Sequence, residues 1–436
     1  MFPNIINMSY SFTTLITGVS SIDELFSRID DAGLKYKDDE NVVIVYSESN
    51  KRTGDPMSDD IKSVIIDKKT FKPITSQFNK LYYNDDTENF LKNKSWSNVT
   101  VKECYEGTMI IVFNHANKWY VCTRKCIDAK KSFWIKNISY HDLFMQSIEN
   151  KFTFDQLNPN YCYHFILLHY MNKNIVSYPQ FGDRYMTVAH AMTTEKYTLK
   201  RVNYVICNSI IYPKEIKCDS IDDAKKKIAL LSKNDVIQNK ITIEGFIIEH
   251  IENDTITLLK LQTSLYTYVS SVKPNVSNIH AMFLELYQHD HYLNVAPFFV
   301  ENSRDVLNRI HNAMKTITDD FYKIYHCTKN HKNPELYERL PKSYKDALYA
   351  IHGMYLSKKN ESVKKQQTID NEIPIEMRKY VAITINDIYT CLKNIDPYTL
   401  TRIFVNRLDL LNDTVVISFL KKDCFDTIYQ GKLLLM

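Results

Sequence analysis

Two glutamate–glycine pairs, Glu106-Gly107 and Glu244-Gly245, are the places where this sequence is best equipped for chemistry. The chain has only 8 glycines in 436 residues, whereas average usage of roughly 7% would give about thirty. A chain this sparing is expected to keep glycine where the backbone needs a positive φ or a close approach to another group. No other Glu-Gly pair occurs, so each one is a candidate site where a carboxylate lies beside a specialised backbone position.

Two nucleophilic side chains precede the first pair. Lys102 and Cys104 belong to "VKECYEGTMIIVF" (101–113), which has the pattern of a strand, a Glu-Gly corner and a second strand. Residues i and i+2 of a strand point to the same side, about 6.6 Å apart. We therefore expect the amine and the thiol to project toward one pocket, and both are groups that serve as nucleophiles in covalent catalysis.

At 436 residues the chain is too long for one ordinary core, so its length predicts two or three domains. Hydrophobic content is 44% and charged content 24%, values typical of globular proteins. The net charge of +4 is too small to assign nucleic-acid binding from the overall field alone. No long apolar run and no basic leader followed by an apolar segment occurs, so we expect neither a membrane span nor a secretory signal.

The nine cysteines lie at irregular spacings, and no two pairs have zinc-ribbon spacing. We expect reduced thiols and a cytoplasmic location. His164 and His169 in "YHFILLHY" are five residues apart, which places them on opposite faces of a strand. They are therefore expected to lie in the core or at an edge, and not to share a metal ion.

The patterning predicts two domains. Residues 1–275 contain strand-like runs rich in Val, Ile, Tyr, Phe and Thr, such as "NVVIVYS" (41–47) and "ITIEGFIIEHI" (241–251), interrupted by short helices. This is an α+β pattern dominated by antiparallel strands. Residues 280–436 follow three-and-four spacing and predict an all-α domain. Within it, the charged segment 357–372 is expected to be a mobile polar connector.

The motif order resembles a known superfamily. The first domain contains, in order, "NKLYY" (79–83), "ECYEGT" (103–108), "VCTRK" (121–125), "YCYHFILLHYMNKNIVSY" (161–178), "IEGFII" (243–248) and "LLKLQTSLY" (258–266). This series is similar to the covalent nucleotidyltransferases, and above all to the phage-type RNA ligases that repair tRNA. The resemblance covers about residues 40–270. It implies an antiparallel-sheet nucleotidyltransferase (ATP-grasp-like ligase) domain that uses ATP and Mg²⁺ to form a lysyl-AMP intermediate and then seals RNA.

The resemblance assigns roles residue by residue. Glu106 and Gly107 match the end of the nucleophile motif, but Cys104 occupies the position of the nucleophilic lysine. Glu244 matches the carboxylate that holds the metal ion. Lys260 matches the first lysine of the last motif, which stabilises charge on the α-phosphate.

Further positions depart from the family pattern. Gln262 replaces the second lysine of the last motif. In the middle motif Phe165 matches an aromatic residue near the nucleotide sugar, but Ile166 follows it where the family has an acidic residue. Lys125 replaces the glycine that usually follows Thr-Lys/Arg. The signal for the fold is thus retained while several chemical groups are missing.

The sequence therefore predicts an RNA-ligase-like protein with an eroded adenylyltransferase site, a pseudoenzyme that binds RNA or a nucleotide. If active, it would use ATP and Mg²⁺, with Lys102 as a surrogate nucleophile. The main alternative is a non-enzymatic interaction protein that keeps the ligase fold and binds a protein partner through its helical domain. Exposed apolar residues on the helices would favour that alternative, and a lysine-lined pocket holding Glu244 would favour the first reading. A capping-type guanylyltransferase is a third, less well matched alternative.

Overall fold

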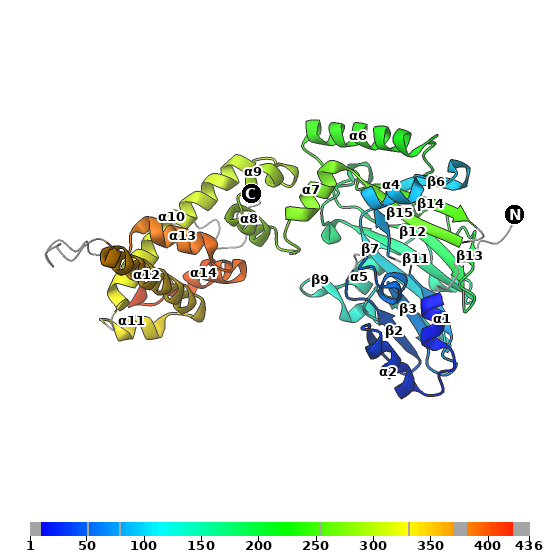
Figure 1. Ribbon diagram of the computed structural model, residues 1–436, viewed down its shortest axis with the longest axis horizontal. Coiled ribbons are helices and arrows are strands. Elements are labelled where there is room, and N and C mark those ends of the chain that lie inside the picture. Colours follow the sequence, from blue (N-terminus) through cyan, green and yellow to red (C-terminus); the bar gives the residue numbers. More distant parts are fainter. Residues whose placement is uncertain are drawn as a thin grey trace. The chain divides into compact units, whose positions relative to one another are not determined.

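The computed structural model describes residues 10–49, 52–77, 80–252, 255–329, 332–368 and 382–421. The chain divides into two compact units, Met1–Ser271 and Val272–Met436. The first unit contains three main sheets with helices packed on them, and the second is helical (Figure 1).

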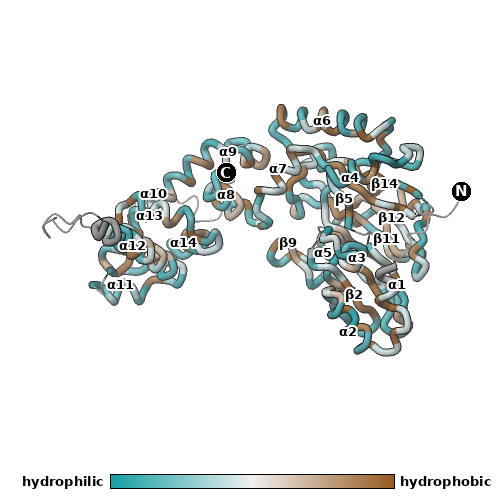
Figure 2. Tube along the Cα trace, viewed as in Figure 1, coloured by the Kyte–Doolittle hydropathy of each residue, from teal (hydrophilic) through white to brown (hydrophobic). Residues whose placement is uncertain are grey.

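A four-stranded antiparallel sheet begins the first unit, with strand order β1-β2-β3-β4. Its strands and the helices near them are β1 (Lys35–Asp38), β2 (Val42–Tyr46), β3 (Ser63–Asp67), β4 (Pro73–Ser76), α1 (Tyr10–Ile16), α2 (Ile22–Asp31) and α3 (Pro56–Asp60). Every residue of β2 and β3 is buried. One face packs on α1 and α2, and the other packs on the next sheet. Burial on both faces explains why β2 is apolar throughout instead of alternating, as its brown colour shows (Figure 2).

A five-stranded antiparallel sheet of order β13-β12-β11-β7-β8 forms the centre of the unit. Its strands and covering helix are β7 (Thr108–His115), β8 (Lys118–Cys122), β11 (Tyr161–His169), β12 (Met186–Glu195), β13 (Arg201–Val202) and α5 (Tyr140–Ile148). A short hairpin joins β9 (Phe133–Ile135) to β10 (Ile138–Ser139). One face of the sheet packs against α5 through Phe144, Phe165 and Leu167. The opposite face packs against β2 and β3 through Ile111 and Phe113.

The third sheet has the order β5-β15-β14-β6, antiparallel except for the β5–β15 pair. Its elements are β5 (Tyr82–Tyr83), β6 (Val99–Cys104), β14 (Gly245–Glu252), β15 (Thr255–Gln262), α4 (Asp85–Leu91) and α6 (Ile221–Gln238). Phe246, Ile248 and Leu259 face Ala224 and Ile228 of α6. Because strand residues alternate between faces, their neighbours Ile247 and Lys260 must lie on the other face.

The second unit is built from amphipathic helices. They are α8 (Ile279–Gln288), α9 (Tyr292–Val295), α10 (Ser303–Thr328), α11 (Pro334–Arg339), α12 (Lys342–Thr368), α13 (Ile385–Asn394) and α14 (Pro397–Leu410), preceded by α7 (Ser264–Val272) at the boundary. Asp396 caps α14 by accepting a hydrogen bond from the Thr399 amide, with Pro397 in the first turn. Arg407 and Asp320 form a fully buried ion pair of 2.7 Å that ties α14 to α10.

The predicted fold class is confirmed: antiparallel sheets in a mixed α+β unit are followed by a helical region. The connector expected at 357–372 is wrong over its first part, because α12 continues as a helix through Thr368. Its charged residues suit a solvated helix surface as well as a loop, and the rest of the segment lies outside the described residues. No helix among the described residues is long and apolar enough to cross a membrane.

Candidate active site

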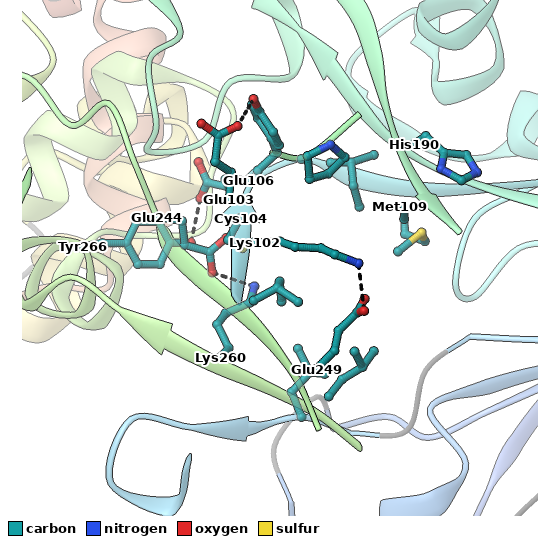
Figure 3. Close-up of a pocket in the computed structure, with 18 of the residues that line it drawn as sticks. Lys102, Glu103, Cys104, Glu106, Met109, His190, Glu244, Glu249, Lys260 and Tyr266 are labelled. Atoms are coloured by element: carbon teal, nitrogen blue, oxygen red, sulfur yellow. Dashed lines mark hydrogen bonds and ion pairs between the residues drawn. The ribbon is translucent and has the colours of Figure 1, made fainter. Parts of the chain in front are cut away.

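A cavity of about 380 Å³ lies between the third sheet and the edge of the central sheet. The strands β6, β14 and β15 contribute polar side chains to it, including Lys102, Glu249 and Lys260. Met109 of β7 and Ile166 of β11 supply an apolar wall opposite them. Figure 3 shows these residues around the cavity, with dashed lines for the Lys102–Glu249 and Lys260–Glu244 ion pairs.

Strand register explains why distant residues meet here. Ile247 at the centre of β14 lies opposite Lys102 of β6 on one side and Lys260 of β15 on the other. Two residues earlier, Gly245 lies between Cys104 and Gln262 in the same way. Directly opposed residues share a face of the sheet. These side chains therefore form two adjacent rows on the cavity face.

The two glycines are required by crowding from neighbouring backbone. A Cβ atom on Gly245 would lie 2.1 Å from the Leu261 carbonyl oxygen, and one on Gly107 would lie 2.4 Å from the Leu167 carbonyl oxygen. Neither glycine has a positive φ. Close approach is thus the reason for both, and the partner is an adjacent strand.

Glu244 is the centre of a buried polar cluster. Its Oε1 accepts hydrogen bonds from Lys260 Nζ at 2.7 Å and from Gln262 Nε2 at 2.9 Å. Burial opposes ionisation, but the Lys260 charge and the bonds from Lys260 and Gln262 lower the pKa of Glu244 overall. Burial also opposes the charge on Lys260, whereas Cys104 and Glu244 raise its pKa. The pair is therefore ionised, and Gln262 keeps the geometry of a donor without adding a second positive charge.

Cys104 is buried, and its Sγ donates a hydrogen bond to Glu244 Oε2 at 3.4 Å. Burial and the neighbouring Glu244 carboxylate raise the pKa of this thiol far above its usual range. A cysteine attacks as the thiolate. In this environment the thiol stays protonated, so Cys104 is a hydrogen-bond donor and a poor nucleophile.

Glu106 lines the same cavity as Glu244, but its carboxylate is used within the protein. Oε2 accepts hydrogen bonds from the backbone amides of Ile175 and Val176 at 2.9 and 2.7 Å. Oε1 accepts one from the hydroxyl of Tyr266 at 2.8 Å. Burial raises the pKa of Glu106, although the two amides lower it in part. Glu106 thus fixes the wall of the cavity formed by the segment after β11.

Lys102 forms an ion pair with Glu249. Its Nζ lies 2.8 Å from Glu249 Oε2, and Arg201 Nη1 lies 3.1 Å from Glu249 Oε1. Burial works against ionisation of Glu249, but Arg201 and Lys102 lower its pKa overall. Lys102 and Cys104 lie on the same side of β6, as predicted, since both line the cavity. Their partners differ, because Lys102 pairs with Glu249 and Cys104 with Glu244.

No family model matches the chain. A curated relative, the "Immediate-early protein ICP-46 homolog" of Invertebrate iridescent virus 3, is 27% identical over 150 residues, which are 31% of this chain and 33% of that protein. The chain therefore matches about a third of that relative's length.

Similar solved structures include an archaeal ATP-dependent RNA ligase described in two forms. Form 1 has 12% identity and a TM-score of 0.39 over 67% of this chain and 72% of that one. Form 2 has 13% identity and a TM-score of 0.39 over 67% and 71%. A protein of Aquifex aeolicus assigned as an ATP-dependent DNA ligase has 12% identity and a TM-score of 0.41 over 64% and 70%.

The three similar structures named here are described as ATP-dependent RNA or DNA ligases. At identities of 12–13% the likeness concerns the fold alone. The roles of individual residues rest on the contacts of this chain's own side chains. Five positions assigned by the motif resemblance line one cavity; they are Cys104, Glu106, Gly107, Glu244 and Lys260. Gln262 joins them through its bond to Glu244.

Phe165 is the exception. Its side chain is fully buried in the core cluster under α5, on the face of β11 that points away from the cavity. The adjacent Ile166 lines the cavity instead. The period of two along a strand explains this difference, because neighbouring residues point to opposite faces. The position where the family has an acidic residue is therefore the one at the cavity, and here it is apolar.

Sequence reasoning missed Lys62 and Tyr266 as residues of the cavity. Tyr266 is the last residue of the segment 258–266 that carries Lys260, so the motif contained it although no role was assigned to it. Lys62 precedes β3 in a different sheet, and nothing in its local sequence connects it to the motifs. Only the packing of the sheets brings it to this cavity.

The cavity offers few ligands for a divalent metal ion and a lining suited to a nucleotide. Among the residues that the structure describes, no group of three His, Cys, Asp or Glu side chains could hold a metal. Mg²⁺ commonly enters with nucleotide phosphates and takes only one or two protein carboxylates. Glu244 could supply one such ligand. The apolar wall, the lysines and the cavity volume fit a nucleotide, since ligand sites typically span roughly 300–1,000 Å³.

Proposed function

We propose that this chain is a ligase-like protein that binds a nucleoside triphosphate in the cavity holding Glu106 and Glu244, with RNA as its nucleic-acid partner. It is a pseudoenzyme with respect to the family's nucleophile, because Cys104 occupies the position of the nucleophilic lysine. The observation that carries the proposal is the single cavity in which Glu244, Lys260 and Glu106 meet beside an apolar wall. The RNA partner is supported by the motif resemblance alone.

The charges of the cavity support phosphate binding. Lys260 is the amine nearest to Glu244, and Lys62 and Lys102 line the same space. Ammonium groups in a site from which water is partly excluded stabilise phosphate charge more strongly than they would in bulk water. Met109, Ile166, Ile247 and Leu258 offer the apolar surface that a nucleobase requires.

The environment of Cys104 supports the absence of covalent chemistry at that residue. A nucleophile must present a lone pair toward the phosphorus. The Cys104 sulfur is buried and donates a hydrogen bond to Glu244, and its raised pKa means that it keeps its proton. We expect no nucleotide adduct on this residue.

The interaction-protein alternative is supported by apolar side chains exposed on the second unit. Leu293, Tyr349 and Tyr398 are 62%, 82% and 73% exposed. Single exposed apolar residues are ordinary on soluble proteins, however, and they need not form one contiguous patch. The lysine-lined cavity around Glu244 favours the nucleotide-binding function.

Titration calorimetry with ATP and GTP in the presence of Mg²⁺ tests this function. The substitution Ile166→Trp fills the cavity without changing its charge, and we expect it to weaken binding at least tenfold, about 1.4 kcal/mol. The matched control Phe133→Trp enlarges a side chain that is 54% exposed on β9, and it should bind like the wild type.

A wild-type protein that binds neither nucleotide would contradict the proposal. Equal binding by the Ile166→Trp protein would place the nucleotide elsewhere on the chain. A gel-shift titration with labelled single-stranded RNA, run on the same proteins, tests the RNA partner separately.

A further inference from the structure

Lys62 is a cavity residue whose backbone is fixed, whereas its side-chain amine has no hydrogen-bond or ion-pair partner among the described residues. It lies between the end of α3 and the start of β3, and its carbonyl oxygen accepts a hydrogen bond from the Ser47 amide at 3.4 Å. This bond extends the β2–β3 ladder by one step beyond the Tyr46–Ser63 pair. The half-buried side chain then reaches the cavity that contains Cys104 and Glu244.

The three lysines of the cavity differ in their partners. Lys102 is paired with Glu249 at 2.8 Å, and Lys260 is paired with Glu244 at 2.7 Å. Within the part of the chain that the structure describes, Lys62 makes no hydrogen bond or ion pair through its amine. An amine held by a carboxylate keeps its proton and its lone pair is not available, so Lys62 is the lysine best able to attack.

The charges around Lys62 favour its neutral form. Lys260 of β15 and Arg124 after β8 repel a further positive charge, and Glu244 attracts one more weakly. Burial together with Lys260 and Arg124 lowers the pKa of Lys62 to about 8. A lysine desolvated beside other cations is a recognised form of activated amine nucleophile.

We propose that Lys62 is the residue that becomes covalently nucleotidylated in this cavity, with a nucleoside triphosphate as the donor. This inference rests on the proposed nucleotide binding. The neutral amine of Lys62 forms a P–N bond to the α-phosphorus, and the P–O bond to the β-phosphate breaks with its electron pair leaving on pyrophosphate. One proton passes from the nitrogen to water. The product is a phosphoramidate on a lysine that the motif resemblance does not identify.

Mass spectrometry of the full-length protein tests the assignment. The wild type is incubated with ATP or GTP and Mg²⁺ near pH 8, weighed intact and then mapped by peptide sequencing. We expect a gain of one nucleoside monophosphate located on Lys62. In Lys62→Arg the guanidinium has no available lone pair, so the adduct should be lost. The nucleotide is kept at a concentration that calorimetry on this variant shows to be saturating, so that loss of the adduct is not loss of binding.

The control is Lys68→Arg, which changes a lysine that follows the same strand but pairs with Asp38 outside the cavity. This protein should form the adduct as the wild type does. Nucleotide binding without any adduct, an adduct mapped to Lys102 or Cys104, or an adduct that persists in Lys62→Arg would each overturn the inference and leave nucleotide binding intact. Absence of nucleotide binding would overturn the proposed function itself and this inference with it.

Discussion

At the residue scale, the glycines of the two Glu-Gly pairs are explained by the strands beside them. Gly245 begins β14 between Cys104 and Gln262, where the strands β6 and β15 both approach it. Its neighbour Glu244 reaches Lys260 and Cys104 because no side chain at residue 245 holds the strands apart. The rare glycine and the adjacent carboxylate are therefore parts of one arrangement.

Substituting Gly245 tests this explanation. We expect Gly245→Ala to lower the free energy of unfolding of the first unit by about 2 kcal/mol or more, because overpacking a core typically costs about 1–3 kcal/mol and the new Cβ would lie 2.1 Å from a carbonyl oxygen. The matched control is Gly353→Ala in α12, where nothing lies within 4 Å of the added atom. Alanine should stabilise that helix by up to about 1 kcal/mol. Thermal unfolding of both proteins provides the comparison, and a neutral Gly245→Ala would refute the crowding argument.

At the element scale, strands β11 and β12 carry two buried histidines, His164 and His169, and a partly buried one, His190. Burial lowers the pKa of His164 to about 3 and that of His169 and His190 to about 4. His164 forms a 3.1 Å hydrogen bond with Thr75 on β4, which links the central sheet to the first one. The expectation that His164 and His169 do not share a metal ion agrees with their burial in separate surroundings, since His169 contacts Gln146 of α5.

These histidines predict sensitivity to acid. An unfolded histidine has a pKa of about 6.5, so between pH 6.5 and 4 the unfolded state binds more protons than the folded state. Stability therefore falls as the pH drops through this window, by about 1.4 kcal/mol per pH unit for each histidine. Urea unfolding between pH 7 and pH 5 measures this slope.

The variant His164→Gln should reduce this slope by about 1.4 kcal/mol per pH unit, which corresponds to one proton. This holds whatever the substitution does to stability at neutral pH. His289→Gln changes an exposed histidine of the second unit and is the control. Equal slopes for wild type and His164→Gln would show that His164 does not titrate on unfolding.

The elements themselves were largely predictable from local patterns. The apolar run 41–47 contains β2, and the pattern in 241–251 contains most of β14. Errors arose where neighbouring residues decide the outcome. Phe165 and Ile166 differ by one position in a strand that is apolar on both faces, so periodicity alone could not assign the cavity face. The segment 357–368 is helical despite its charge, because a solvated helix face tolerates lysine and glutamate.

At the scale of the whole molecule, the site depends on contacts between distant parts of the first unit. Glu106 and Glu244 come together because β6 and β14 are neighbours, although 138 residues separate them in sequence. The order of the motifs predicted this convergence, whereas local pattern could not. Lys62 arrives from the first sheet, so no motif indicated it. The three-and-four spacing of apolar residues predicts the helical second unit. The same spacing does not indicate what that unit binds.

The most direct test of the account is a crystal structure of the full chain with a non-hydrolysable ATP analogue. We expect the analogue to occupy the cavity that contains Glu106 and Glu244, with its phosphates within hydrogen-bonding reach of Lys260 or Lys62. An analogue bound on another surface, or no binding at millimolar concentration, would contradict the claim that these residues form a nucleotide site.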